Sequence, residues 1–145
     1  MKRLFAIFLA ALLPAAASAT EHRQGPLALP AVIRMLGKGQ PVAVTVDLSL
    51  CSPVPNDANP SKTRGGLRIN AFRLTDDGTL AFADEHMTID LDGKPIVQFL
   101  RYKVRPDKSA QFSMTVFSLP PYEQKGTTLE FNCALDRGLS FFPTR

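Results

Sequence analysis

The sequence has few of the side chains on which most catalytic and metal sites depend. Its 145 residues include two histidines, two cysteines and no tryptophan. It contains no Cys-x-x-Cys pair, no Gly-x-Ser-x-Gly motif and no phosphate-binding Gly-x-x-x-x-Gly-Lys-Ser/Thr motif. These absences argue against dithiol redox chemistry, a hydrolase nucleophile elbow and a nucleotide-binding loop. We expect no cofactor.

No apolar run is long enough to span a membrane. The uncharged run at residues 4–13 covers about 10 residues, whereas a membrane-spanning helix needs roughly 20. Lys2 and Arg3 precede this run, and small residues follow it up to Thr20, which is typical of a cleavable signal peptide. We therefore predict a signal peptide at residues 1–19, and a periplasmic or secreted mature protein with no stable membrane anchor.

Neither sign of charge dominates the mature chain. The sequence has 17 basic residues, of which Lys2 and Arg3 belong to the leader, against 13 acidic ones, so the mature charge is only +2. A charge this close to balance gives little support to a nucleic-acid partner, and we expect none. The remaining 126 residues suffice for one hydrophobic core but not for two, which predicts a single domain over residues 20–145.

Two cysteines, Cys51 and Cys133, lie in the exported part of the chain. Two thiols in an oxidising compartment with no third competitor most simply form one disulfide. The bridge would close a loop of about 80 residues, worth roughly 4 kcal/mol in the chain-entropy model. A metal-binding or redox-active pair is the weaker alternative, because no histidine lies near either cysteine in the sequence.

One helix and a run of strands are predicted. Residues 27–39 carry apolar side chains at helical spacing and end at glycines. A period of two then predicts strands at 42–50, 67–75, 79–91, 96–105, 110–116, 127–135 and 139–142. Between the first two of these strands, prolines and polar residues break the pattern and predict a long loop at 51–66.

The joints between these strands indicate the fold class. Most are tight turns, which imply antiparallel neighbours. The apolar parity changes between Ala83 and Met87, which predicts a β-bulge near residues 84–86. Cys51 has the opposite parity to Leu50, so its disulfide requires a twist at the end of the first strand. The predicted fold class is mainly β, a twisted antiparallel meander forming a sandwich or partial barrel, with one short N-terminal helix.

The order and spacing of several segments are those of a known family. The segments are VAVTVDLSLC at 42–51, GGLRINAF at 65–72, FADEHMT at 82–88 and QFLRY at 98–102, followed by Cys133, Gly138, Phe141 and Phe142. Together with the length, the leader and the two cysteines, they resemble the VirK family of small exported bacterial proteins. The resemblance implies an association with host-associated proteobacteria. The name of the family comes from a virulence regulon. It implies no catalytic residue.

Asp84 and His86 are candidate residues for a ligand or a metal. They lie two apart in a predicted strand, so both side chains face one side, where a histidine with a carboxylate can bind a metal or act as a general base. Further metal ligands would have to come from Asp47, Asp90 or Asp92. The plainer alternative is that the pair forms hydrogen bonds at the predicted bulge.

A basic stripe is the second candidate site. Arg101, Lys103 and Arg105 alternate along one predicted strand and share a face, which is suited to an anion or a glycan. A solvated face of the sheet is the plainer alternative. The two glycines of residues 61–66, beside basic and hydroxyl side chains, could also offer backbone N–H groups to a phosphate, although ordinary loop chemistry explains this segment as well.

Three functional classes follow from these observations. We favour an exported, non-catalytic protein that binds a protein or a small ligand through its β surface, because catalytic groups are scarce. An enzyme or metal-binding protein centred on Asp84 and His86 is the first alternative. A structural or accessory protein of the cell envelope without a ligand is the second.

Overall fold

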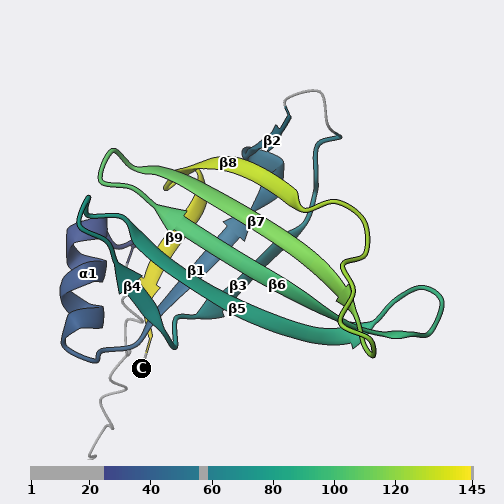
Figure 1. The fold of residues 1–145 in the computed structure, drawn as a ribbon. Coiled ribbons are helices and arrows are strands. Elements are labelled where there is room, and N and C mark those ends of the chain that lie inside the picture. The colour runs from purple at the N-terminus through teal and green to yellow at the C-terminus, as the bar shows by residue number, and fades with distance from the viewer. Residues whose placement is uncertain (1–24, 56–58, 145) are drawn as a thin grey trace, which may run out of the picture.

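The computed structural model describes residues 25–55 and 59–144, which form one helix and one strongly curled sheet (Figure 1). The predicted signal peptide at 1–19 lies outside the described residues. The elements in chain order are α1 (Leu29–Gly37), β1 (Val42–Asp47), the 3-10 turn η1 (Leu48–Leu50), β2 (Ser52–Val54), β3 (Arg64–Arg68), β4 (Phe72–Leu74), β5 (Leu80–Ile89), β6 (Pro95–Val104), β7 (Ser109–Ser118), β8 (Leu129–Leu135) and β9 (Gly138–Pro143).

The sheet curls into a half-barrel. Its strand order is β3-β1-β9-β8-β7-β6-β5-β4, with β2 added beside β8. In Figure 1 the strands β1, β3 and β9 lie behind the long strands β5–β7, so the inner face of the curl is enclosed by the sheet itself. The predicted mainly β fold with a partial barrel and one short helix is confirmed.

Helix α1 lies at one end of the half-barrel (Figure 1). Pro30 occupies the first turn, where its missing N–H leaves no hydrogen bond unmade. Leu29, Val32 and Leu36 are buried, and their spacing places them on one face of the helix. No helix within residues 25–55 and 59–144 is long and apolar enough to cross a membrane.

The inner face of the sheet forms the core. Phe82 on β5 stacks on Tyr102 on β6 with ring centroids 4.8 Å apart, and Tyr102 packs against Phe112 on β7 at 5.1 Å. The buried residues of the opposite wall come from β1, β8 and β9 and are Val42, Val44, Val46, Phe131, Leu135, Leu139 and Phe141. The period of two therefore separates an apolar inner face from a more polar outer face.

The first strand is shorter than the predicted 42–50. The side chain of Asp47 accepts a hydrogen bond from the Ser49 N–H at 3.0 Å, and the chain turns into η1 there. In a strand that continued to residue 50, alternation would point the Cys51 side chain away from the side that Leu50 faces. The turn ends this alternation before Cys51. Cys51 and Cys133 form the predicted disulfide, with their Cα atoms 4.5 Å apart.

The predicted strand at 67–75 is two strands at opposite edges of the sheet. β3 ends at Arg68 and β4 begins at Phe72. Ile69 between them is buried, and its N–H donates to the Val42 carbonyl at 2.9 Å. A three-residue linker is short, with about 14 Å of reach between the flanking Cα atoms, so the two sheet edges approach each other at this end. The predicted loop at 51–66 also contains β2 and the start of β3.

The predicted bulge near 84–86 is wrong. β5 pairs with β6 in one unbroken register from Leu80 to Ile89. The apolar parity changes because Met87 and Ile89 lie on the outer face, where 68% and 65% of each side chain is exposed. The alternation of β5 is thus regular, and these two side chains are apolar without being buried.

Candidate functional site

The inner face of the half-barrel holds a cavity of about 440 Å³ beside the core. This volume lies within the range of small-molecule binding sites. Most of its wall is apolar and comes from β1, η1 and β6–β8. These residues are Val46, Leu48, Leu100, Tyr102, Phe112, Met114, Leu129 and Phe131.

Polar side chains surround the opening of the cavity. His86 on β5 lies directly across from Gln98 on β6, and Ser61 and Thr63 come from the segment before β3. All four are exposed or half-buried. The Ser61 hydroxyl donates to the Thr63 hydroxyl at 3.0 Å, which orders this rim. An apolar interior with a polar rim suits a ligand that has an apolar part and a polar part.

The opening lies between two strand edges. Arg64 and Gly65 on β3 and His86 on β5 line the same cavity, yet no residue of β3 pairs with β5 in the described parts of the chain. β4 covers β5 only along Leu80–Phe82. The rest of the outer edge of β5 therefore borders the opening.

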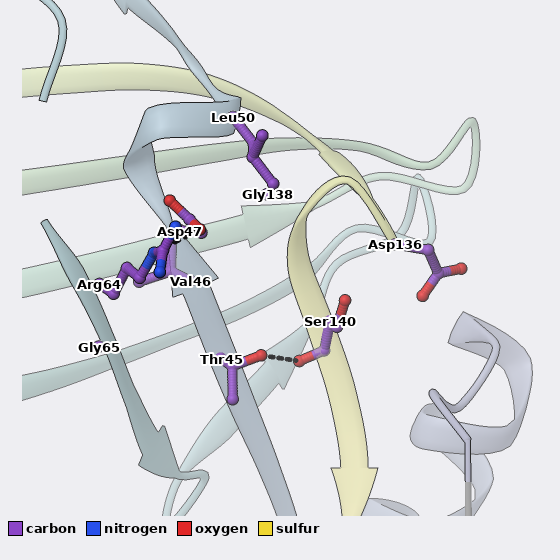
Figure 2. A pocket seen from close by; sticks show the side chains of 9 residues that line it. All are labelled: Thr45, Val46, Asp47, Leu50, Arg64, Gly65, Asp136, Gly138 and Ser140. Carbon is purple, nitrogen blue, oxygen red and sulfur yellow. Dashed lines mark hydrogen bonds and ion pairs between the residues drawn. The ribbon is translucent and has the colours of Figure 1, made fainter. Parts of the chain in front are cut away.

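A second, larger hollow of about 520 Å³ lies on the outer side of β1 and β9 (Figure 2). It is shallow, and two of its three charged residues, Asp47 and Arg64, are paired with each other. Arg64 Nε lies 2.7 Å from Asp47 Oδ2. The Ser49 hydroxyl, the Ser49 N–H and the Arg64 guanidinium hold the pKa of Asp47 below its ordinary value. These contacts fix the turn after β1 and the pairing of β1 with β3, so the inner cavity is the better candidate site despite its smaller volume.

Asp84 and His86 share the inner face, as predicted. His86 lines the cavity and Asp84 is half-buried beside it, but no hydrogen bond or ion pair joins the two. No group of three or more histidine, cysteine or acidic side chains that could hold a metal occurs in the described residues. Asp47 is tied to Arg64, and Asp90 is bound by Lys125. A metal at Asp84 and His86 stays a prediction.

Tyr102 is the ionisable residue of the cavity wall whose environment is most unusual. Only 2% of its side chain is exposed. Burial, and after it the negative charge of Asp84, raises the pKa of Tyr102 to about 12. The phenol is therefore neutral at every physiological pH and can serve as a hydrogen-bond donor at the cavity wall.

The basic stripe lines two hollows of the outer face, and Lys103 lines both of them. Arg101 and Lys103 lie on the outer face of β6 and line one hollow of about 340 Å³ together with Arg73 of β4. Arg105 lies beyond the strand in a different hollow, beside Asp76 and Asp77. Anion binding by Arg101, Lys103 and Arg105 stays a prediction, and Arg73, which the sequence also placed near the stripe, lies beside two of these residues.

The apolar lining of the cavity was missed by reasoning from the sequence. Leu100, Met114 and Leu129 follow the same alternation as core residues, so no local pattern separates a residue that lines a cavity from one that fills the core. His86 was singled out because of its residue type, and it lines this cavity together with several residues of the segment 61–66, which the sequence offered as a possible phosphate site.

Comparison with known proteins gives a consistent family. A family model described as VirK protein matches residues 27–122. "Uncharacterized protein y4wH" of Sinorhizobium fredii (strain NBRC 101917 / NGR234) is 48% identical over 145 residues and is covered, like this chain, to 100%. "Uncharacterized protein in pinF2 3'region" of Rhizobium radiobacter is 52% identical over 143 residues, with 97% of each chain covered.

A solved structure agrees with this family. The crystal structure of lpg1832, a VirK family protein from Legionella pneumophila, matches with a TM-score of 0.70 at 20% identity. The match covers 79% of this chain and 94% of the other. At this level of identity, the likeness shows a shared fold.

Proposed function

This chain belongs to the VirK protein family, and because the two relatives named above are uncharacterised, we propose its function from the candidate site itself. The protein is an exported, non-catalytic binding protein that receives an apolar group of its ligand in the inner cavity. The observation that carries this proposal is the apolar cavity of about 440 Å³ that opens to solvent between β3 and β5.

The energetics of such a cavity favour an apolar ligand group of moderate size. An apolar group that loses about 200 Å² of accessible surface gains roughly 5 kcal/mol. The loss of translational and rotational freedom offsets much of this gain, so apolar contact alone gives weak binding. His86, Gln98 and the hydroxyl groups of Ser61 and Thr63 add hydrogen bonds at the rim and orient the polar part of the ligand.

The export part of the proposal is supported by the leader pattern and by the disulfide between Cys51 and Cys133. We expect the protein isolated from the periplasm or the culture medium to begin at Thr20 and to contain no free thiol. Intact-mass measurement before and after reduction and alkylation checks both points. A folded product that still begins at Met1 would contradict the export proposal and leave the cavity proposal untouched.

Filling the cavity is expected to abolish binding of an apolar probe. Gly65 lies opposite Val46, whose side chain lines the cavity, and a Cβ atom built at Gly65 has nothing within 4 Å. The Cβ of a Gly65→Leu side chain therefore has free space, and we expect the rest of the side chain to extend into the cavity beside Val46. We expect it to weaken binding of 1-anilinonaphthalene-8-sulfonate at least tenfold, as measured by fluorescence titration of the mature, oxidised protein.

A matched control adds the same side chain to the outer face. Thr45 precedes Val46 on β1 and points to the opposite side of the sheet, so Thr45→Leu is expected to change probe affinity less than twofold. Met114→Trp fills the cavity from the opposite wall if Gly65→Leu fails to fold. Unchanged affinity in a well-folded cavity-filling variant, or no probe binding by the unaltered protein, would overturn the proposal.

A further inference from the structure

The direction of the hydrogen bonds along β5 follows from the two turns that flank it. The Asp90 N–H donates to the Lys94 carbonyl at 2.9 Å, and the Thr75 N–H donates to the Thr79 carbonyl at 3.0 Å. Residues of an antiparallel ladder direct their N–H and C=O groups to alternate sides. The even-numbered residues of β5 therefore bond to β6, and the odd-numbered residues point toward β4 and the outer edge.

This edge is unpaired along most of its length. β4 ends its pairing at the non-hydrogen-bonded pair of Phe72 with Phe82, so Ala83 still faces the β4 segment, and the backbone groups of Glu85, Met87 and Ile89 point outward beyond it. No strand pairs with these three residues on this side in the described part of the chain. Three residues with one donor and one acceptor each can pair with an added strand of about five residues.

The edge also lacks several common features that block strand addition. Native proteins protect exposed edges with proline, lysine, bulges or very short strands. Residues 83–89 contain neither proline nor lysine, and the register with β6 has no bulge. The inward-pointing Asp84 and the exposed Glu85 are protective charged side chains on this edge, and charges of this kind restrict pairing to complementary partners.

The side chains beside the edge indicate the chemistry of a partner. On the inner face Asp84 and Thr88 flank His86, which lines the cavity, and on the outer face Met87 and Ile89 are largely exposed. Apolar side chains of an added strand can pack on the exposed pair. A basic side chain can lie beside the carboxylate of Asp84, since opposite charges on adjacent strands attract.

We propose that the ligand of the cavity is an extended peptide segment of a partner protein that adds as a strand to the free edge of β5. Its backbone pairs with the odd-numbered residues from Glu85 to Ile89, alternate apolar side chains enter the cavity, and a basic residue lies beside Asp84. The proposal rests on the proposed binding function, since it identifies the ligand class of the same cavity.

The test uses a defined peptide and a pair of protein variants. The probe is a fluorescein-labelled heptapeptide, Lys-Thr-Val-Thr-Val-Thr-Val, in which the lysine and the valines lie on one face of the strand, titrated by fluorescence anisotropy. Met87→Pro removes one outward N–H, and proline is tolerated at a strand edge when its N–H faces solvent. We expect Met87→Pro to weaken peptide binding at least tenfold. Met87→Ala removes the same side chain but keeps the N–H, and we expect it to weaken binding less than threefold.

A second pair and a direct readout keep the proposal testable. Ile89→Pro and Ile89→Ala repeat the comparison if Met87→Pro does not fold. Hydrogen exchange of the unaltered protein should show protected amides at Asp84 and His86 without peptide, because these bond to β6. The amides of Glu85 and Met87 should gain at least tenfold protection when the peptide is added.

The outcomes separate this proposal from the binding function. If the aromatic sulfonate probe binds the cavity but the peptide does not bind, or if the proline and alanine variants lose equal affinity, strand addition is wrong and the cavity function stands. If neither probe binds, both are wrong. Tenfold loss in the proline variant alone, with unchanged binding of the sulfonate probe, supports strand addition.

Discussion

Replacing both Cys51 and Cys133 with alanine is expected to lower the free energy of unfolding by about 4 kcal/mol. The two cysteines are separated by 82 positions in the sequence. A cross-link that closes a loop of this length removes conformational freedom chiefly from the unfolded chain, which the chain-entropy model values at roughly 4 kcal/mol. Since a domain of this size typically has a net stability of about 5–15 kcal/mol, the variant is expected to be marginal.

The position of the bridge adds a local consequence. Cys51 follows η1, and Cys133 lies on β8, so the bond joins the turn that carries Leu48 to the strand that carries Phe131. Both of these side chains line the cavity. Loss of the bond is therefore expected to weaken binding of the aromatic sulfonate probe even at temperatures where the variant remains folded.

Urea denaturation of the oxidised protein and of the double alanine variant measures this effect. The unaltered protein held in a reductant is the matched control, and it should lose nearly as much stability as the double variant, because both lack the same cross-link. Alanine is preferred to serine, since a hydroxyl at the buried Cys133 position would add an unpaired polar group. A loss of less than about 1 kcal/mol in both comparisons would show that the loop is already restrained in the unfolded chain.

Much of the architecture could be predicted because it is encoded locally. The alternation of Leu100, Tyr102 and Val104 with Arg101 and Lys103 reports directly which face of β6 is buried. The helix has a similarly local signal, with Pro30 at its start and glycines after its end. The disulfide needed only the export signal and the count of two cysteines.

The errors arose where alternation was taken to mean burial. Met87 and Ile89 alternate correctly, but the interpretation that they had to be buried produced a bulge that β5 does not have. The turn at Asp47 did have a local signal. An aspartate side chain readily accepts a hydrogen bond from the backbone N–H two residues later, as Asp47 does from Ser49. Reading that signal would have ended the strand at the correct place.

The cavity could not be predicted from the sequence because it depends on the curl of the whole sheet. Its walls come from strands that are distant in the sequence. Gly65 and His86 line the same cavity only because the sheet curls and brings β3 and β5 to the same side of the molecule. Small rotations between adjacent strands add up to this curl, and no single pair of residues specifies it. The same curl leaves the outer edge of β5 beside the opening.

The second large effect that we expect is a loss of stability at high pH that depends on Tyr102. Burial and the charge of Asp84 raise the pKa of this phenol from 10.0 to about 12 in the folded protein. Between these two values the unfolded chain has released the proton while the folded chain still holds it, so the unfolded state binds fewer protons and stability falls as pH rises. The contribution is complete below pH 10 and lost above pH 12. A shift of this size corresponds to at most about 2–3 kcal/mol.

The Tyr102→Phe variant isolates this contribution from other groups that titrate in the same range. Hydrogen bonding to Asp90 raises the pKa of Lys125, so the stabilisation that Lys125 gives the folded state also decreases as pH rises. This effect is present in both the unaltered protein and Tyr102→Phe. We expect the stability advantage of the unaltered protein over Tyr102→Phe to shrink by about 2–3 kcal/mol between pH 9 and pH 12, as measured by urea denaturation at each pH. Tyr122→Phe, at a site that is 60% exposed, is the matched control and should leave the pH profile unchanged. Parallel profiles for the unaltered protein and Tyr102→Phe would mean that the phenol is more accessible to water through the cavity than its burial indicates, and direct titration of tyrosinate absorbance would then place its pKa near 10.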